Sequence, residues 1–267
     1  MPIAAALKNI YSLEGKVVLI TGAAGGICSE ICKAIASVGA TVALADINGD
    51  GMKDIVSQME GNGHSIHNTD LRSLDSITST VGEVVKVHGR IDGLINGAAV
   101  SKRLGYLDVD EELYDKIMEI NLKAAFFMGQ QVVLQAMRHT GGKIVNLASY
   151  NSTRYSGGLS VYTCSKTGIV GLTRAMAAEW GKFNIQANAI APGFTETPLT
   201  EPLKNDPERY DRVRTLTCSQ RMAKPDELVG LTVLLLSEAS SYMTGQMYNV
   251  DGGALIEGTP WGFPTNY

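Results

Sequence analysis

The chain alternates short apolar runs with longer segments of helical periodicity. Most of the runs are apolar throughout rather than alternately apolar and polar, which is typical of strands buried on both faces of a parallel sheet. Strands are expected at KVVLI (16–20), TVALA (41–45), SIHN (65–68), DGLIN (92–96), KIVNLA (143–148), IQANAIA (185–191) and QMYNV (246–250). Residues 26–38, 113–137 and 162–181 carry apolar side chains at helical spacing. This alternation predicts an α/β fold: a Rossmann-like, doubly wound, seven-stranded parallel sheet with helices on both faces.

The organisation indicates one domain over residues 1–267, because no Pro/Ser-rich linker or internal repeat divides the chain. Three segments fall outside the alternation of strands and helices. Residues 1–12 are expected to form an N-terminal extension, and the aromatic residues 255–267 a C-terminal tail packed on a neighbouring surface. Residues 194–223 are polar and interrupted by prolines, and we expect them to form a lid over a substrate pocket.

The composition narrows the class of protein. Of the 267 residues, 45% are hydrophobic and 19% charged, which is typical of soluble globular enzymes. A net charge of −4 gives no basic surface for nucleic acid or an anionic membrane. No apolar stretch reaches the length of a membrane span or signal peptide, and four scattered cysteines do not make a disulfide scaffold. We therefore expect a cytoplasmic, reduced protein.

A glycine-rich turn, TGAAGGIC at residues 21–28, follows the first predicted strand and precedes a predicted helix. Such a turn is a good anion site, because free backbone N–H groups and the helix dipole both point at a bound phosphate. Gly22 permits the tight turn, and Gly26 is expected to let the backbone approach a pyrophosphate. The third position of such loops packs helix against strand, and here it is Cys28.

An acidic residue supports a dinucleotide ligand. Asp46 ends the second predicted strand, about 20 residues after the loop, where a carboxylate accepts hydrogen bonds from adenosine ribose hydroxyls and repels a 2′-phosphate. No Lys or Arg occurs at residues 23–25 or immediately after Asp46. The pattern favours NAD over NADP; the alternative is an ordinary acidic loop residue.

Cys28 and Cys32 raise the alternatives of a redox pair or a metal site. Their i, i+4 spacing places both on one helix face, where disulfide geometry is poor. Zinc needs two further ligands, and His64 and His67 lie near the third strand, on the far side of the second. Two small buried thiols are the better interpretation, and we predict no metal site.

Tyr162 and Lys166 lie four residues apart at the start of a helical segment, so they share one face of that helix. An ammonium group beside a phenol stabilises the phenolate and lowers the pKa of the tyrosine. Such a pair can supply a general base near neutral pH. By itself the spacing is common, and an exposed helical pair is the simpler interpretation.

The order of motifs changes that interpretation. TGAAGGIC, Asp46, INGAA (95–99), MEINL (118–122), KIVNLAS (143–149), YTCSK (162–166), APGFTET (191–197) and GQMYNVDGG (245–253) follow one another along the chain. Together they resemble the short-chain dehydrogenase/reductase family, in its compact single-domain branch. The resemblance covers about residues 12–255.

The resemblance implies a catalytic set. Tyr162 would be the acid/base, and Lys166 would bind the nicotinamide ribose and lower the tyrosine pKa. Ser149 would hydrogen-bond the substrate oxygen, and Asn121 would hold a water in a proton relay from Lys166. The cofactor NAD would also contact Gly22, Gly25, Gly26, Ile27, Asp46, Asp70, Leu71, Asn96, Pro192, Gly193, Thr195 and Thr197.

Two positions depart from the family pattern. Cys28 replaces the last loop glycine, and INGAA stands where the family often has N-N-A-G. Asn96 is retained, but Ala99 adds a methyl group beside the expected nicotinamide pocket. Neither change removes a charge or a catalytic donor, so we expect altered fit and retained activity.

The C-terminal part most resembles family members that act on sugars, sugar acids and polyols, including gluconate 5-dehydrogenases. Candidate substrate residues are placed by adjacency to the catalytic segments: Ser101, Arg103, Tyr150, Asn151, Arg154 and Phe194. Either arginine can pair with a substrate anion, or can be an ordinary surface arginine. Oxoacyl thioesters, steroids and quinones remain alternative substrates.

Two other functions are weaker interpretations. A non-catalytic NAD-binding regulator has no need of the full catalytic set, and a nucleotide-sugar epimerase or dehydratase usually has a larger C-terminal region. The apolar surface of helices 113–137 and 162–181 predicts self-association as a homodimer or homotetramer, as is usual in the family. The tail around Trp261 and Phe263 is expected either to pack on its own subunit or to reach a neighbouring one.

Overall fold

The computed structural model describes residues 9–256. Seven parallel strands form one sheet in the order β3-β2-β1-β4-β5-β6-β7. Their bounds lie within a residue or two of the predicted runs, so the predicted doubly wound α/β fold is confirmed. The strands are β1 (Val17–Thr21), β2 (Thr41–Asp46), β3 (Ser65–Asn68), β4 (Gly93–Asn96), β5 (Gly142–Leu147), β6 (Ile185–Pro192) and β7 (Met247–Val250).

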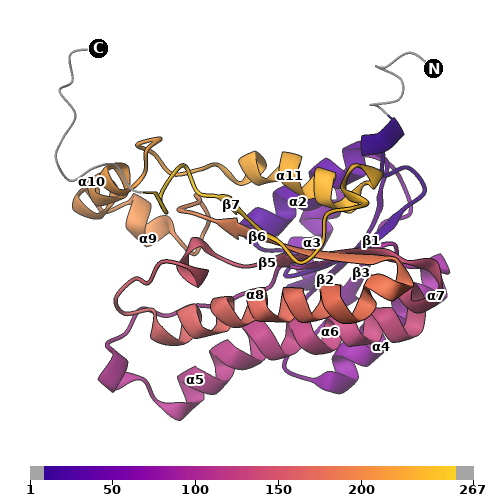
Figure 1. Cartoon of the computed structure of the whole chain (residues 1–267), viewed down its shortest axis with the longest axis horizontal. Helices are drawn as coiled ribbons and strands as arrows, with labels where there is room; N and C mark the ends of the chain where they lie inside the picture. Colours follow the sequence, from indigo (N-terminus) through magenta and orange to yellow (C-terminus); the bar gives the residue numbers. More distant parts are fainter. Residues whose placement is uncertain (1–8, 257–267) are drawn as a thin grey trace.

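Helices cover both faces of the sheet, as Figure 1 shows. On one face lie α2 (Gly26–Ser37), α3 (Gly49–Val56) and α11 (Val229–Leu236), and on the other α4 (Leu74–His88), α6 (Ala124–Val132) and α8 (Ser160–Trp180). The remaining α-helices are α5 (Glu111–Met118), α7 (Arg138–Thr140), α9 (Glu201–Lys204) and α10 (Pro207–Leu216). Short helical turns are η1 (Tyr106–Asp108), η4 (Tyr150–Ser152), η5 (Gly181–Phe183), η6 (Pro225–Leu228) and η7 (Glu238–Ser240).

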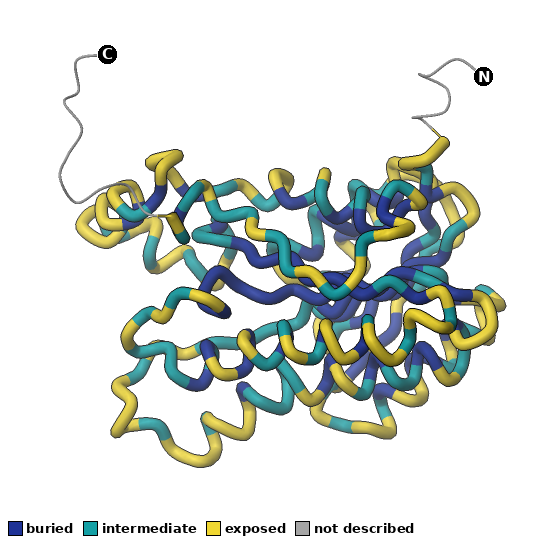
Figure 2. Tube along the Cα trace, viewed as in Figure 1, coloured by how far each residue is buried: buried dark blue, intermediate teal, exposed yellow. Residues whose placement is uncertain are grey.

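The core consists of two apolar layers separated by the sheet, and the buried strands run between them in Figure 2. Leu19 and Ile20 are adjacent in β1 and both fully buried, yet they belong to opposite layers. Successive side chains of a strand point to opposite faces. A strand that is apolar at every position is therefore what a sheet covered on both faces requires, which explains why the apolar runs located the strands.

The segment predicted as one helix over 113–137 runs from 111 to 140 and contains two π-helical turns. These are η2 (Glu119–Lys123) and η3 (Val133–Met137), on either side of α6. A π-turn inserts one residue into a helix and is frequently found at functional sites. Periodicity did not predict either turn.

The segment 194–223, predicted as a lid, leaves the end of β6 and carries α9 and α10. Its two ends are joined by a parallel bridge between Thr195 and Ala223. The backbone N–H of Glu196 donates to the carbonyl of Ala223 at 2.9 Å. The segment is thus a closed excursion from the sheet edge, and Figure 1 shows α9 and α10 beyond the end of β6.

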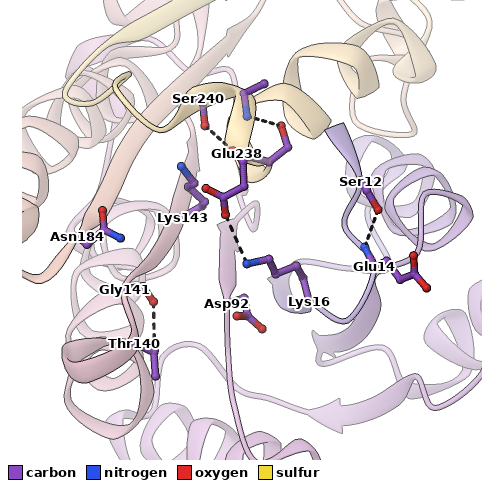
Figure 3. A network of polar contacts seen from close by, with 12 residues as sticks. Ser12, Glu14, Lys16, Asp92, Thr140, Gly141, Lys143, Asn184, Glu238 and Ser240 are labelled. Atoms are coloured by element: carbon purple, nitrogen blue, oxygen red, sulfur yellow. Dashed lines mark hydrogen bonds and ion pairs between the residues drawn. The ribbon is translucent and has the colours of Figure 1, made fainter. Parts of the chain in front are cut away.

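Polar contacts tie the chain together at the amino ends of the strands (Figure 3). The Lys16 ammonium lies 3.5 Å from the Glu238 carboxylate, and the Asp92 carboxylate accepts a hydrogen bond from the Val17 N–H at 2.9 Å. The buried Lys143 ammonium donates to the side-chain oxygen of Gln186 at 2.7 Å. Burial lowers the pKa of Lys143. None of the helices between residues 9 and 256 has the length and apolar character needed to cross a membrane.

Candidate functional site

The candidate residues gather at the carboxyl ends of the strands, on the edge opposite the contacts of Figure 3. The glycine loop follows β1, Asp46 ends β2, Ser149 follows β5, and Gly193 follows β6. The strand order reverses between β1 and β4. Ligands of open α/β sheets bind at such a switch point.

Ser149 and Tyr162 form the reactive pair. Ser149 lies just after the end of β5 and Tyr162 lies in the first turn of α8, near enough for the Ser149 side chain to lower the pKa of the tyrosine. Ser149 also accepts a hydrogen bond from the Asn151 N–H at 3.2 Å, which fixes its rotamer. The two side chains therefore lie close together, as contact with one substrate oxygen requires.

The pKa of Tyr162 differs from the sequence prediction. Burial is the largest effect and raises it, the hydrogen bond from Ser149 lowers it, and the nearby Tyr150 raises it. Lys166 lies 5.9 Å from the centre of the Tyr162 ring. The net pKa of Tyr162 is therefore above its ordinary value in the protein alone, because removing the phenol from water outweighs the other effects. A lowering of this pKa by Lys166 stays a prediction.

Lys166 is directed at the sheet. Its side chain is buried, and its ammonium donates to the carbonyl of Leu147 at 2.6 Å. Burial lowers the pKa of Lys166 to about 8. The lysine thus loses its proton more readily than an exposed lysine. One N–H of its ammonium is used by the Leu147 carbonyl, which leaves two N–H donors for other acceptors.

Asn121 lies in the π-turn η2 and is buried. Its side-chain amide is clamped by Val100, accepting from the Val100 N–H at 2.8 Å and donating to the Val100 carbonyl at 2.9 Å. The same amide donates to the Ser165 hydroxyl at 3.1 Å, and Ser165 lies between Tyr162 and Lys166. The π-turn therefore places Asn121 against the catalytic helix.

The first turn of α2 is suited to an anion. No side chain of residues 9–256 caps it, and it contains no acidic residue. Its first N–H groups have no helical partner by geometry. Gly25 is the N-cap, so the free N–H groups begin at Gly26 and Ile27. These residues fit the pyrophosphate of a dinucleotide.

The two loop glycines have different neighbours. Gly22 has φ +67°, and a Cβ there would lie 2.6 Å from the Cα of Ala98. A Cβ on Gly26 would meet Pro198 at 2.9 Å and Thr197 at 3.0 Å. A side chain at residue 26 would therefore collide with residues 197 and 198, and the close approach of the Gly26 backbone to a pyrophosphate stays a prediction.

Asp46 holds the loop from the side. One carboxylate oxygen accepts from the Ala24 N–H at 3.0 Å and the other from the Asn48 N–H at 2.9 Å. A carboxylate has about four acceptor sites, so two remain for ribose hydroxyls. The structure therefore places the carboxylate beside the glycine loop, where the adenosine ribose is expected.

Asp70 and Leu71 follow β3. Asp70 is exposed, and its carboxylate accepts from the Arg72 N–H at 2.9 Å. Leu71 and Asn96 line one cavity of about 10 Å³ together with Asn121.

Asn96 is buried and hydrogen-bonded inside the protein. Its amide donates to Asn146 at 2.8 Å, and Asn146 donates to Thr173 of α8 at 2.9 Å. Asn96 is buried and tied to a network that joins β4, β5 and α8, which favours a structural role for it.

The turn after β6 brings the predicted clamp to the glycine loop. Pro192 ends β6, and the Gly193 N–H donates to the carbonyl of Val250 at 3.0 Å. The Thr195 hydroxyl donates to the Gly193 carbonyl at 3.3 Å, and the Thr197 N–H donates to Thr200 at 2.9 Å. The turn therefore lies where a cofactor held by α2 is within reach.

The structure brings two of the substrate candidates together. The rings of Tyr150 and Phe194 lie 5.0 Å apart, and the Tyr150 hydroxyl lies 3.3 Å from the Ser156 hydroxyl. Asn151 is buried behind Ser149. The rings of Tyr150 and Phe194 thus form an aromatic wall next to Ser149 and Tyr162, and the Tyr150 hydroxyl lies at the edge of this wall.

The two candidate arginines bind the backbone. Arg103 donates to the carbonyl of Gly157, and Arg154 donates to the carbonyl of Ala254 at 2.9 Å. They hold the loops around the site, although a guanidinium has further donors. Ser101 is half-buried in the loop that starts at Val100. The tail with Trp261 and Phe263 lies outside the described residues.

Sequence reasoning missed the residues that hold the catalytic groups. Val100 and Ser165 fix Asn121, and the Leu147 carbonyl holds Lys166. Two of these contacts are made by backbone atoms, which leave no signature in residue type. Cys28 and Cys32 are separate, buried, free thiols.

Comparison with known proteins agrees with this geometry. A family model described as enoyl-(acyl carrier protein) reductase matches residues 22–254. The chain is 37% identical over 250 residues to 3-oxoacyl-(acyl-carrier-protein) reductase FabG of Thermotoga maritima, covering 91% of this chain and 99% of that protein. It is 36% identical over 254 residues to 2-dehydro-3-deoxy-D-gluconate 5-dehydrogenase of Escherichia coli, covering 93% of this chain and 99% of that protein.

A solved structure gives the same result. A gluconate 5-dehydrogenase from Burkholderia cenocepacia, in complex with NADP and tartrate, matches with a TM-score of 0.90 at 28% identity, covering 94% of this chain and all of that chain. Both sequence relatives are more than 30% identical to this chain and cover at least nine-tenths of it. The chain therefore belongs to the short-chain dehydrogenase/reductase family, whose members are oxidoreductases that bind a nicotinamide cofactor and act on CH–OH groups.

Proposed function

We propose that the protein is an NAD-dependent oxidoreductase that interconverts an alcohol and a carbonyl on a small polyhydroxy substrate: a sugar, sugar acid or polyol. The observation that carries the proposal is the pairing of Ser149 with Tyr162, with the Lys166 ammonium 5.9 Å from the tyrosine ring. In oxidation, Tyr162 takes the hydroxyl proton of the substrate. Ser149 donates to the substrate oxygen and keeps it in line.

Lys166 and Asn121 complete the proton path. The Lys166 ammonium is 2.6 Å from the Leu147 carbonyl and has two donors left for ribose hydroxyls and the phenolate. Asn121 is held in place by its two hydrogen bonds to Val100 and is the residue beside which a water of the proton relay would bind. When bound, the nicotinamide ring supplies the hydride acceptor.

The choice of NAD rests on Asp46. Both of its oxygens are held by backbone N–H groups, so the carboxylate is unable to turn away from an incoming 2′-phosphate. The negative charges of the Asp46 carboxylate and of a 2′-phosphate beside it repel each other. No Lys or Arg at residues 23–25 or immediately after Asp46 offsets this repulsion. The Burkholderia gluconate 5-dehydrogenase structure contains NADP, so cofactor choice needs a direct test.

Replacing Asp46 by Ala is expected to lower the ratio of kcat/KM for NAD to that for NADP by about ten-fold or more. Lost ribose hydrogen bonds weaken NAD binding, and lost repulsion favours NADP. Initial rates with each cofactor measure the ratio. Asp50→Ala, which removes an exposed carboxylate four residues on, is the control and should leave the ratio unchanged. A parent enzyme that prefers NADP would contradict the proposal.

Three features support a polyhydroxy substrate. The wall of Tyr150 and Phe194 offers apolar ring faces, and the hydroxyls of Tyr150 and Ser156 lie 3.3 Å apart beside Ser149. Such a pair suits a second oxygen near the reacting carbon. The sugar-acid names of similar proteins point the same way. We propose that residues 194–223 form the lid over this substrate.

A panel of substrates tests the function. NADH formation is measured by absorbance with polyols, aldoses, sugar acids and simple secondary alcohols, and NADH consumption with acetoacetyl-CoA. We expect polyhydroxy substrates to give the highest kcat/KM. The thioester is included because FabG of Thermotoga maritima is 37% identical to this chain, and a preference for it would favour that second function. An enzyme inert with the whole panel would contradict both.

We also propose that the protein assembles as a homodimer or homotetramer through α6 and α8. A groove of about 230 Å³ between these helices is lined by apolar side chains, including Leu134, Leu172, Met176 and Trp180. Phe126 and Leu134 are half-exposed there. Exposed apolar patches of this kind mark association sites.

Leu134→Glu is expected to shift the protein toward a smaller species, because it places a charge in the proposed interface. Light scattering after size-exclusion chromatography measures the mass. Val87→Glu, at an exposed apolar position of α4, is the matched control. An unchanged mass for Leu134→Glu, or a parent that is already a monomer, would contradict the proposed interface.

A further inference from the structure

Cys28 occupies space that a side chain at residue 97 would need. An ideal Cβ built on Gly97 would lie well under 3.0 Å from the Cys28 sulfur. Real Cβ atoms essentially never come that close to another heavy atom. The same Cβ would lie 2.9 Å from the Thr21 carbonyl and 3.6 Å from Leu147. Cys28 is buried. The cysteine that departs from the glycine-loop pattern is therefore seated directly on Gly97.

Gly97 begins a short connection between the cofactor loop and the catalytic helix. Its N–H donates to the Thr21 hydroxyl at 3.2 Å, and the next residue, Ala98, packs against Gly22 of the loop. Two residues further, Val100 exchanges two hydrogen bonds with Asn121.

Asn121 continues this connection to α8. It donates to Ser165 at 3.1 Å, and the Ser165 hydroxyl donates to the Tyr162 carbonyl at 2.7 Å. A displacement of residues 97–100 would thus move Ala98, which packs under Gly22 of the glycine loop, together with Val100, which holds Asn121. Protein interiors are close-packed, so such a displacement is not absorbed locally.

We propose that Cys28 and Gly97 are a matched steric pair that positions residues 97–100, and through them aligns the glycine loop with Asn121. The requirement is one of volume: the sulfur at residue 28 takes the space that a side chain at residue 97 would need, and the Thr21 carbonyl limits the same space from a second side. Cys28 is a positioning residue, and its thiol takes no part in the reaction. Burial raises the pKa of Cys28 to about 12, in keeping with an unreactive thiol.

The pair makes a specific prediction for a double-mutant cycle. Gly97→Ala is expected to weaken NADH binding about ten-fold and to lower the melting temperature by roughly 5 °C, because the new methyl group overlaps the sulfur. Cys28→Ala should weaken NADH binding less than Gly97→Ala does, because it removes the sulfur that packs on Gly97 but creates no overlap. The double variant Cys28→Ala/Gly97→Ala should recover the part of the lost binding that the overlap with the sulfur causes, and the contact with the Thr21 carbonyl at 2.9 Å should account for the part that is not recovered.

Cys32→Ala is the matched control. Cys32 is a buried cysteine one turn further along α2, and it does not lie among the nearest atoms to Gly97. Cys32→Ala/Gly97→Ala should therefore bind NADH no better than Gly97→Ala. NADH fluorescence titrations well below the melting temperature report the folded protein, so loss of stability alone does not change the measured affinity.

This inference rests on the nicotinamide binding of the proposed function, and the two fail differently. A parent that does not bind NADH contradicts the proposed function. A parent that binds, with additive effects of the two substitutions or with equal rescue by Cys32→Ala, contradicts the steric pair. If Gly97→Ala alone is not recovered folded, the two double variants are compared. Only Cys28→Ala/Gly97→Ala should then be recovered and bind NADH, and failure of both contradicts the pair.

Discussion

Tyr162→Phe is expected to lower kcat/KM about 10³-fold while leaving the fold and NADH affinity unchanged. The substitution removes only the hydroxyl that meets the substrate oxygen. Ser149 keeps its hydrogen bond from the Asn151 N–H, so the wall of the site stays in place. Steady-state kinetics, NADH titration and thermal melting together separate loss of chemistry from loss of structure.

Tyr155→Phe is the control for this change. Tyr155 lies on the loop after η4, close in sequence to the site, and its side chain is 71% exposed. The same atom is removed there without touching the reactive pair, so activity should match that of the parent. A Tyr162→Phe enzyme with comparable activity to the parent would mean that another group carries the proton, and the proposed catalytic role would fail.

The strands and the gathering of the site were predictable because each rests on a local pattern. The run VVLIT is buried at every position, and burial on both faces leaves that pattern in the sequence. Asp46 ends one strand and Ser149 lies two residues after the end of another, and parallel strands end at one edge. Topology then brings together residues more than 100 positions apart.

The parts that could not be predicted depend on contacts between segments. Lys166 binds the backbone carbonyl of Leu147, and any residue at position 147 would supply that carbonyl. Arg103 and Arg154 meet backbone carbonyls as well, although a charge near a pocket suggests a substrate anion. The space beside Gly26 is filled by Thr197 and Pro198, which lie more than 170 residues further along the chain and leave no signal in the glycine loop itself.

Lys166→Met is expected to lower kcat/KM for oxidation near pH 7 by about 10²-fold, and to raise the pH of half-maximal activity by about one unit or more. Oxidation needs the Tyr162 phenolate, and burial already raises the pKa of Tyr162. The ammonium is the nearby charge that favours the phenolate. Rates from about pH 6 to 10.5 measure the shift, and an unshifted profile would contradict this role.

Lys143→Met is the control, because Lys143 is also a buried lysine with a lowered pKa, and it lies at the amino end of β5, away from the site. Its loss should leave the pH profile of activity unchanged. Both substitutions remove a buried ammonium, so only the effect specific to the site should differ between them.

Stability should respond to Lys166 with a definite sign. Its pKa is about 8 in the folded chain against an ordinary 10.5, so below pH 8 both states hold the proton and the folded state bears the burial penalty of the ammonium. Between about pH 8 and 10.5 the unfolded chain holds more protons at Lys166 than the folded chain does. The contribution of Lys166 to the free energy of unfolding of the parent therefore rises with pH in this range. The free energy of unfolding of Lys166→Met relative to the parent should therefore fall by about 2 kcal/mol from pH 7 to 10. Denaturant titrations at both pH values measure this difference between variant and parent. A difference that does not change with pH would mean that burial of the Lys166 ammonium does not destabilise the folded protein.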